Sequence, residues 1–429
     1  MQYFSTSNKN IRADFRKATI EGQPADKGLY FPEHIPQLGN EFITNIKNLS
    51  KEEIAIEVIR PYIGQSIDNT TLEKIISETI FFDFPLVRIN NSISALELFH
   101  GPTLAFKDVG ARFMSRCLSH FAKDEKRKVT VLVATSGDTG GAVADAFFDV
   151  DNVDVVILYP SKKVSDIQEL QLTTLGSNIS ALEIEGTFDD CQRLVKNAFA
   201  DQDLNKKLYL TSANSINVAR WLPQQFYYFY AHQQWQHEEP PVVCVPSGNF
   251  GNICAGLLAH KSGLPVAHFI SACNANDVVP SYLSSGKYES KPAVATLSNA
   301  MDVGNPSNFV RIIKLFQDNF FDLKNVLTAY SITDSETVDA IKHVKSTFNY
   351  LLDPHGAVGF TALHRYLAEH SDQKGYFLET AHPVKFNIEE IINEKVELPA
   401  SVKHLLTKEK KSVKMRADER ELKSFLLSR

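Results

Sequence analysis

Short apolar runs rich in β-branched residues recur along the chain, each followed by a turn of small residues and a helical pattern. VTVLVAT, VDVVILY and ISALEIE occupy 129–135, 153–159 and 179–185. Because the first run is continuous rather than alternating, it predicts a strand buried on both faces, and the alternation of strands and helices predicts parallel pairing. The same rhythm resumes at 241–247 and 267–273. The chain is therefore predicted to be α/β, with two open, mostly parallel units.

This rhythm divides the chain into three regions. Residues 129–224 are predicted to form a small α/β unit, and residues 83–128 together with 225–429 a larger one. Residues 1–82 carry weaker strand signals and some helical patterns, and we interpret them as an accessory N-terminal region. No Gly/Ser-rich linker separates the regions, so they are expected to pack closely together.

Charge and composition exclude several classes of protein. Lys and Arg number 45 and Asp and Glu 51, so the net charge is −6 and no basic excess favours a nucleic-acid partner. The apolar runs fall far short of the roughly 18–20 residues that span a bilayer, and the N-terminus has no signal-peptide core. We therefore expect a cytoplasmic protein without a membrane partner. The five cysteines are scattered without CxxC spacing, so no metal site is predicted. The sequence carries no signal for the oligomeric state.

One lysine stands near the start of a predicted helix. Lys107 lies in HGPTLAFKD (100–108), between Phe106 and Asp108. An amine sheltered by apolar neighbours at a helix N-terminus can have its pKa lowered enough to form a Schiff base. On this segment alone, a solvated surface lysine explains the residue better.

A glycine-rich turn, TSGDTGG (135–141), joins a predicted strand to a helix. Backbone N–H groups at such a turn can converge on an anion such as a carboxylate. A purely structural turn explains the segment about as well. The fragment is also similar to the GDSGG of trypsin-like proteases and the DTG of aspartic proteases, but a helix follows it and no second DTG is present.

A second glycine-rich turn, PSGNFGN (246–252), also follows a strand and precedes a helix. Its N–H groups could form a phosphate nest at the positive end of the helix. No GK[ST] follows and the spacing is not GxGxxG, so ATP and dinucleotide sites are disfavoured. In YFLETAHPVKF (376–386), Thr380 ends a strand, where its hydroxyl could donate to a heterocycle nitrogen or simply cap the strand.

The four segments together supply an amine, a carboxylate site, a phosphate nest and a hydroxyl for a ring nitrogen. Those are the requirements of pyridoxal phosphate acting on an amino acid. The four segments resemble the threonine synthases, a family of pyridoxal-phosphate enzymes of fold type II (the tryptophan-synthase-β fold). Further segments carry the resemblance almost from end to end: YFSTSN (3–8), DKGLYFPEHIP (26–36), KVSDIQELQ (163–171), NSINVAR (214–220), MDVGNPSNF (301–309) and DPHGAVG (353–359).

The resemblance implies a role for each site residue. Lys107 would carry pyridoxal phosphate as a Schiff base and Thr380 would face its ring nitrogen. The cofactor phosphate would be held by Gly248, Asn249, Phe250, Gly251 and Asn252. The substrate carboxylate would be bound by Ser136, Gly137, Asp138 and Thr139, where Asp138 replaces the asparagine of many relatives in the wider fold. A substrate phosphate would be bound by Ser215, Asn217 and Arg220 of the NSxNxxR pattern.

The reaction implied is the conversion of O-phospho-L-homoserine and water into L-threonine and phosphate, a β,γ-replacement. Two alternatives stay open from the sequence. One is another enzyme of the same fold, such as a serine/threonine dehydratase or a sulfhydrylase. The other is a non-catalytic relative that keeps the fold and binds a ligand. A site for a second phosphate, belonging to the substrate, discriminates the first alternative from a threonine synthase.

Overall fold

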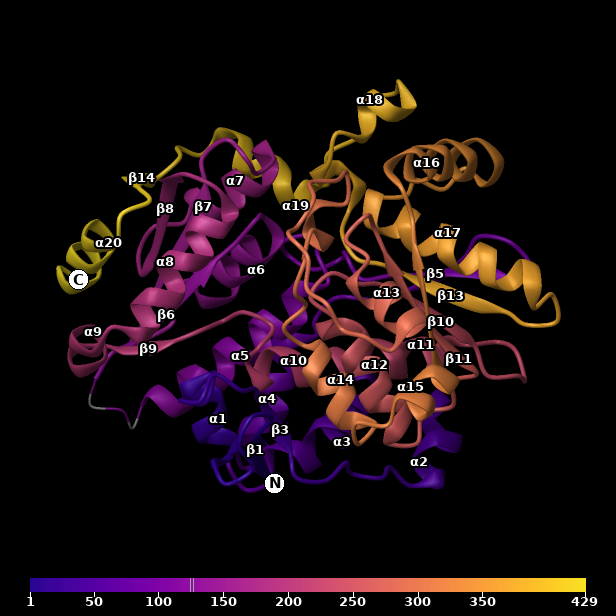
Figure 1. Ribbon diagram of the computed structural model, residues 1–429, viewed down its shortest axis with the longest axis horizontal. Helices are drawn as coiled ribbons and strands as arrows, with labels where there is room; N and C mark the ends of the chain where they lie inside the picture. Colours follow the sequence, from indigo (N-terminus) through magenta and orange to yellow (C-terminus); the bar gives the residue numbers. More distant parts are fainter. Residues whose placement is uncertain (124, 126) are drawn as a thin grey trace.

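Three β-sheets organise the chain in the computed structural model, which describes residues 1–123, 125 and 127–429. Two are the predicted, mostly parallel sheets, and the third is a small antiparallel sheet near the N-terminus. Figure 1 shows the two parallel sheets to the left and right, with the indigo N-terminal region beneath them. The predicted α/β class, with two mostly parallel units and an N-terminal region, is confirmed.

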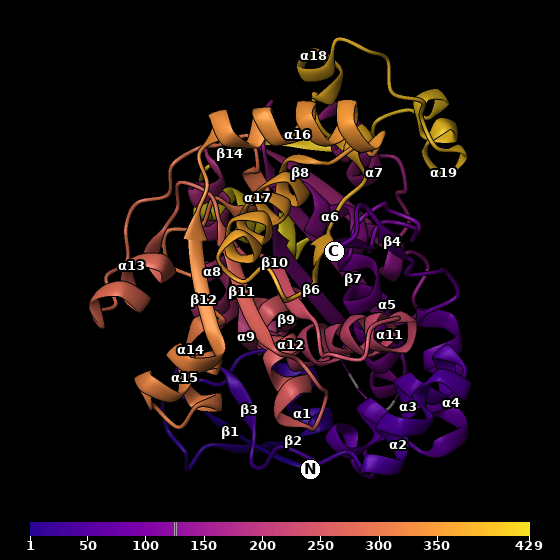
Figure 2. The same cartoon turned by 90° about the vertical axis from the view of Figure 1, so that its right-hand side faces the viewer.

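The larger sheet has six strands, and its neighbours pair in parallel except for the antiparallel pair at one edge. The strand order is β12 (Leu327–Ser331), β11 (His268–Cys273), β10 (Val242–Pro246), β13 (Gly375–Glu379), β5 (Ile93–Glu97) and β4 (Leu86–Arg88). Every residue of β10 and β13 is buried because helices cover both faces of the sheet. One face carries α16 (Asp334–Phe348) and α17 (Pro354–Glu369), and the other α5 (Lys107–Ala122) and α12 (Gly251–Lys261). Figure 2 shows α16 and α17 in front of the sheet.

The smaller sheet has five strands that all pair in parallel. Their order is β14 (Ser412–Arg416), β8 (Ile179–Glu185), β7 (Val153–Pro160), β6 (Val129–Ala134) and β9 (Tyr209–Thr211). All residues of β6 and β7 are buried, as their continuous apolar sequences predict. One face packs on α6 (Asp138–Phe147) and α5, and the other on α8 (Phe188–Ala200) and α20 (Glu419–Leu427).

The C-terminal segment corrects the predicted division of the chain. We expected residues 225–429 to belong with the larger sheet, but β14 pairs with β8 of the smaller one. Met415 of β14 and Leu422 and Leu426 of α20 join the apolar cluster on the outer face of that sheet. Figure 1 shows this yellow segment beside β8 and α8. The strand is short, half polar and at a sheet edge, so its sequence gives no signal for which sheet it joins.

The N-terminal region packs beneath α5. Its antiparallel sheet has the order β2 (Arg12–Asp14), β1 (Gln2–Ser5) and β3 (Tyr30–Pro32). The helices that accompany it include α1 (Phe15–Glu21), α3 (Lys51–Ile63) and α4 (Asn69–Thr79). Phe15 of α1 packs edge-on against Phe121 of α5, so the region shares one apolar core with both larger sheets.

Short elements complete the connections. The helices are α2 (Asn40–Asn45), α7 (Asp166–Thr173), α9 (Gln202–Lys207), α10 (Val218–Trp221), α11 (Phe226–Gln234), α13 (Val278–Ser285), α14 (Phe309–Leu315), α15 (Phe320–Val326), α18 (Ile388–Ile392) and α19 (Ala400–Lys403). The 3-10 turns are η1 (Ile46–Asn48), η2 (Leu222–Gln225), η3 (Asn299–Met301), η4 (Pro383–Lys385) and η5 (His404–Thr407). Within the described residues, no helix combines the length and the apolar character needed to cross a bilayer.

Candidate active site

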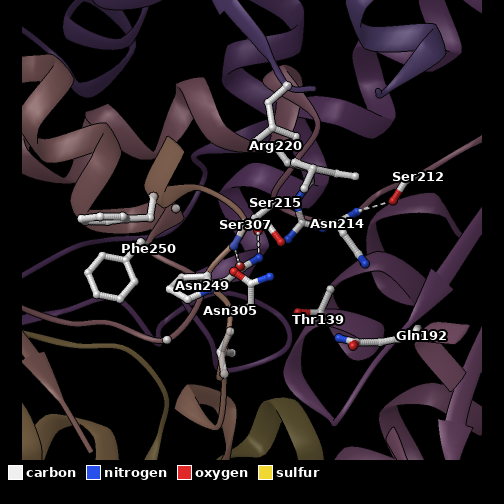
Figure 3. Close-up of a pocket in the computed structure, with 18 of the residues that line it drawn as sticks. Thr139, Gln192, Ser212, Asn214, Ser215, Arg220, Asn249, Phe250, Asn305 and Ser307 are labelled. Atoms are coloured by element: carbon white, nitrogen blue, oxygen red, sulfur yellow. Dashed lines mark hydrogen bonds between the residues drawn. The ribbon is translucent and has the colours of Figure 1, made fainter. Parts of the chain in front are cut away.

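The carboxyl ends of both parallel sheets open into one cleft. Parallel strands end at the same edge of a sheet, so the loops after β5, β10 and β13 gather at one edge of the larger sheet. The loops after β6 and β9 gather in the same way at an edge of the smaller one. Residues from all five loops line a cleft of about 1930 Å³. Figure 3 shows Ser215, Asn249 and Ser307 gathered at its centre, with Arg220 beside them.

Lys107 and Thr380 lie on neighbouring loops in this cleft, as predicted. Lys107 is the first residue of α5, and its side chain is 16% exposed. The N–H of Phe106 donates to the Thr380 carbonyl at 2.9 Å, which joins the start of α5 to the end of β13. Burial lowers the pKa of Lys107; the charge of Asp138 opposes this shift, and those of Lys385 and Arg220 add to it. The Lys107 amine is therefore poised to lose its proton more readily than an ordinary lysine.

The turn before α6 exposes fewer N–H groups than its glycines suggest. Gly137 has φ 145°, a conformation that favours glycine, and serves as the N-cap of α6. The N–H groups of Gly137 and Gly140 both donate to Thr135 Oγ1, at 3.0 and 2.9 Å. Ser136 and Thr139 line the cleft. The prediction that Gly137 contacts a substrate is therefore corrected: its N–H is taken by Thr135, and its role is to allow the conformation of the turn. Ser136 and Thr139 are the residues of this turn whose hydroxyl groups are available in the cleft.

Asp138 is a buried carboxylate between two lysines. Its Oδ1 lies 2.6 Å from Lys385 Nζ and accepts from Gln168 Nε2 at 2.9 Å, and its Oδ2 lies 3.8 Å from Lys107 Nζ. Burial alone would raise the pKa of Asp138, but the two ammonium groups and these hydrogen bonds hold it well below its ordinary value. Asp138 is therefore ionised. The sequence did not single out Lys385, although it stands inside the TAHPVKF segment.

The loop after β10 forms an anion nest at the start of α12. Phe250, the N-cap, has φ 61°, and the first residues of α12 line the cleft, where the unpaired N–H groups of a first helical turn favour an anion. Asn252 Oδ1 accepts from the Tyr228 hydroxyl at 2.8 Å, whereas its Nδ2 is buried without a partner in the described chain. A Cβ at Gly248 would lie 2.6 Å from Met301 Cα, so only glycine fits there. These features suit a phosphate.

Ser215 connects the nest to the loop after β9. Its Oγ accepts from Asn249 Nδ2 at 2.8 Å and from Asn308 Nδ2 at 3.0 Å. Asn249 Oδ1 in turn accepts from the N–H of Ser307 at 2.6 Å (Figure 3). Because both amides donate to the Ser215 oxygen, the hydroxyl proton of Ser215 is left to donate to a ligand.

Arg220 is a buried guanidinium that has no carboxylate partner within the part of the chain that the structure describes. It is 3% exposed, and its Nη1 donates to the Ala213 carbonyl at 2.8 Å. Its Nε is buried without a partner, and among residues 1–123, 125 and 127–429 it forms no ion pair within 4.0 Å. Burial lowers the pKa of Arg220 to about 10, so it stays charged at neutral pH. Buried charges are normally paired, so this guanidinium suits an anionic ligand in the cleft.

Asn217 does not face the cleft. It is fully buried, its Oδ1 caps α10 by accepting from the N–H of Ala219, and its Nδ2 donates to the carbonyls of Thr19 and Ser212. Both amide protons are therefore used by backbone acceptors. The predicted substrate contact of Asn217 is corrected: this side chain holds the loop and the start of α10, which carries Arg220.

His355 in the cleft and Arg311 behind it are two residues that the sequence did not reveal. Arg311 is fully buried and donates to the carbonyls of Tyr30, Ser215 and Ile216, so it ties the N-terminal region to the loop after β9. A lone arginine in the apolar helix FVRIIKL was the signal for it. His355 lines the cleft, faces Asp353 through Nδ1 and accepts from the N–H of Ala300 through Nε2.

Pyridoxal phosphate fits this set of residues. The anion nest with the unpartnered Asn252 amide suits its phosphate, Lys107 suits its carbonyl carbon, and the Thr380 hydroxyl suits its ring nitrogen. The unpaired guanidinium of Arg220 and the free proton of Ser215 remain for a second anion. Ser215 and Arg220 line the same cleft as the nest, and Ser215 is joined to it by the hydrogen bond from Asn249.

Comparisons with known proteins agree with this arrangement. The family model "Pyridoxal-phosphate dependent enzyme" matches residues 83–377, and the models "Threonine synthase N terminus" and "Threonine synthase, C-terminal" match 2–80 and 356–426. Threonine synthase of Haemophilus influenzae is 44% identical over 406 residues, which cover 94% of each chain.

Two solved structures are also similar over nearly the whole chain. The crystal structure of threonine synthase from Escherichia coli has a TM-score of 0.94 at 41% identity and covers 100% of both chains. That of pyridoxal-phosphate-bound threonine synthase from Brucella melitensis has a TM-score of 0.92 at 34% identity and covers 99% of this chain and 98% of that one. The chain belongs to the threonine synthase family of pyridoxal-phosphate-dependent enzymes.

Proposed function

We propose that this protein converts O-phospho-L-homoserine and water into L-threonine and phosphate. The observation that carries the proposal is the buried, unpaired guanidinium of Arg220 in the same cleft as Lys107. A substrate that brings its own phosphate supplies the missing anion. Membership of the family supports the same reaction, and the rival dehydratase reaction on serine or threonine has no use for a second phosphate site.

The cofactor would be held by the nest of Gly248, Asn249, Phe250, Gly251 and Asn252, with Lys107 as its covalent anchor and Thr380 at its ring nitrogen. When bound, pyridoxal phosphate supplies an electron sink that stabilises negative charge on the substrate carbon next to the amine. A neutral hydroxyl at Thr380 leaves the ring nitrogen without a carboxylate partner. Burial of Lys107 favours its neutral amine, which can take the proton from the substrate Cα.

The substrate would be oriented at both ends. Its carboxylate would lie at the N-terminus of α6, where Ser136 and Thr139 offer hydroxyl groups beside the positive helix end. Its phosphate would accept from Arg220 and Ser215. Asp138 would stay between Lys107 and Lys385, where a second carboxylate at direct contact is disfavoured by charge.

The net reaction breaks the Cγ–O bond, replaces one hydrogen of Cβ by the hydroxyl of water and adds one proton at Cγ, while the Cα proton is removed and later returned. Arg220 and Ser215 would hold the phosphate dianion while the Cγ–O bond breaks, because a guanidinium binds phosphate in a fixed, two-pronged geometry. Lys107, which would take the proton from Cα, would also serve the neighbouring carbons that exchange protons. Leaving-group stabilisation by Arg220 and Ser215 and proton transfer by Lys107 would therefore come from different segments of the chain.

Release of inorganic phosphate and formation of threonine from O-phospho-L-homoserine test the proposal, with O-phospho-L-serine and L-threonine as comparison substrates. We expect equal amounts of phosphate and threonine from O-phosphohomoserine and little turnover of the other two. Formation of 2-oxobutanoate from L-threonine without threonine synthesis would favour the dehydratase. Absence of any turnover in cofactor-loaded protein would favour a binding relative.

We also propose that residues 129–224 together with 412–427 form the small unit, that residues 83–128 with 225–411 form the large one, and that 1–82 are an accessory region. The pairing of β14 with β8 supports this revised division. A cytoplasmic location is proposed because all five cysteines are free and buried, as is usual in a reducing compartment.

A further inference from the structure

Lys385 has no task in the chemistry described so far. Its side chain is fully buried, and its Nζ lies 2.6 Å from Asp138 Oδ1 and donates to the Thr103 carbonyl at 2.8 Å. A buried ammonium loses its hydration, and an apolar side chain of similar size would often fill the space at least as stably. The buried ammonium of Lys385 is therefore better explained by a function than by stability alone.

Two lysines share the one carboxylate of Asp138. Lys385 and Gln168 both bind Oδ1, at 2.6 and 2.9 Å, whereas Lys107 Nζ stays 3.8 Å from Oδ2. The shorter ion pair of Asp138 is thus with Lys385 and not with Lys107, the proposed reactive amine. If Lys385 were absent, Lys107 would be the closest cation to Asp138 and would form the direct ion pair itself.

We propose that Lys385 is a positioning residue that draws the Asp138 carboxylate away from Lys107 and so keeps the Lys107 amine free to lose its proton. The inference rests on the proposed function only in taking Lys107 as the reactive amine. A tight pair with Asp138 would stabilise the Lys107 ammonium, which neither attacks a carbonyl nor accepts a proton. With Lys385 in place, the charge of Asp138 is balanced by a different cation.

The other groups around Lys107 do not replace this effect. The charged groups that face it from other elements are Asp138 of α6, Lys385 of η4 and Arg220 of α10. Tyr227 of α11 donates to the Phe106 carbonyl, and burial holds the pKa of Tyr227 well above its ordinary value, so it adds no charge. Asp108, on α5 itself, accepts from the N–H and hydroxyl of Thr103. Asp138 is therefore the carboxylate that decides the protonation of Lys107.

The ion pair of Lys385 with Asp138 also connects the two sheets, so the test must distinguish a loss of stability from an effect on Lys107. Lys385 follows β13 of the larger sheet, whereas Asp138 and Gln168 belong to α6 and α7, which follow strands of the smaller one. Gln171 makes a parallel connection by donating to the Thr103 carbonyl at 3.0 Å. Loss of Lys385 could thus lower stability whether or not it controls Lys107, so a readout specific for Lys107 is needed.

The experiment measures how fast acetic anhydride labels Lys107 in the full-length, cofactor-free chain between pH 6 and pH 10, by peptide mass spectrometry. In Lys385→Met, we expect the labelling profile to move to higher pH and the rate at pH 7 to fall roughly tenfold. Lys385→Arg should stay close to the unsubstituted chain because it keeps the cation. Lys374→Met, which removes an exposed lysine near β13, is the matched control and should change nothing.

Asp138→Asn and the double variant Asp138→Asn/Lys385→Met complete the set. The proposal orders the profiles from low to high pH as Asp138→Asn, then the unsubstituted chain and the double variant, then Lys385→Met. If the labelling profile is the same with lysine and with methionine at position 385, both in the chain with Asp138 and in the Asp138→Asn chain, the positioning role is overturned. A lower melting temperature without a change of profile would likewise overturn it and make Lys385 a structural residue. If Lys385→Met does not fold, Lys385→Gln takes its place and is expected to move the profile to higher pH in the same way, because it also removes the cation that pairs with Asp138. Labelling requires no turnover, so its outcome is independent of whether threonine is formed.

Discussion

Substitution of Arg220 by methionine tests the proposed site for the substrate phosphate. Of the five N–H groups of this guanidinium, one donates to the Ala213 carbonyl, and Nε has no partner in the described residues. The remaining donors are enough for one two-pronged contact with a phosphate. Removal of such a contact to a charge that develops in the transition state costs about 3 kcal/mol, so kcat/KM for O-phosphohomoserine is expected to fall roughly 150-fold.

The assay is phosphate release at substrate concentrations that define kcat and KM separately, together with a cofactor titration. Arg220→Met should raise KM and lower kcat, and its dissociation constant for pyridoxal phosphate should stay within about twofold of normal. Arg220→Lys should lose less, since it keeps the charge but not the planar fork. Arg193→Met is the matched control, because Arg193 is 44% exposed and pairs with Asp190 and Glu419 on the surface.

Two outcomes would refute this reasoning. A kcat/KM within about threefold of normal in Arg220→Met would mean that the guanidinium does not contact the leaving phosphate. Loss of pyridoxal phosphate from the variant, with normal handling of substrate by the protein that retains it, would assign Arg220 to the cofactor site instead. A variant that fails to fold would be replaced by Ser215→Ala, which removes the second proposed donor and is expected to cost about 1 kcal/mol.

Three further predictions concern cofactor affinity, pH and stability. A Cβ at Gly251 would lie 3.3 Å from Ser215 Cβ, so Gly251→Val should weaken pyridoxal-phosphate binding about tenfold in an absorbance titration; reduced stability with unchanged affinity would contradict it. Burial raises the pKa of Asp108 to about 6, so this carboxyl keeps its proton longer in the folded than in the unfolded chain. The contribution of this carboxyl to the free energy of unfolding is therefore present at low pH and lost as pH rises. In urea unfolding, the free energy of unfolding of the unsubstituted chain, measured relative to Asp108→Asn, should fall by about 2 kcal/mol from pH 4 to pH 7. A difference between the two chains that does not change with pH would refute this prediction. Arg311→Met leaves several buried carbonyls without their donor and should lower the free energy of unfolding by about 3 kcal/mol, which an unchanged melting temperature would exclude.

The strands and the loops after them could be predicted because their signals are local. A strand buried on both faces requires a continuous apolar run, and β6 and β7 each carry one. Once the strands are parallel, the sheet edge gathers the following loops without further information. Lys107, Thr380 and the nest around Phe250 therefore meet in the cleft as the sequence led us to expect.

The parts that could not be predicted depend on contacts distant in sequence. Asn217 and Gly137 lie in the predicted motifs, but whether an amide or an N–H faces a ligand or a backbone carbonyl is decided by tertiary packing. Lys385 reaches Asp138 across 247 positions of sequence, so no spacing rule reveals the pair. The half-polar strand β14 could pair with either sheet on its sequence, and the match of Leu422 and Leu426 to the outer face of the smaller sheet decides it.

The central claim is that Lys107 is the reactive amine to which the cofactor is bound. Borohydride reduction of the cofactor-loaded protein, followed by proteolysis and peptide mass spectrometry, tests it most directly, because the chain offers a second buried lysine, Lys385, near the same carboxylate. We expect a single reduced cofactor adduct on Lys107, with Lys385 unmodified. An adduct on Lys385, or none on either lysine in protein that has bound the cofactor, would contradict it.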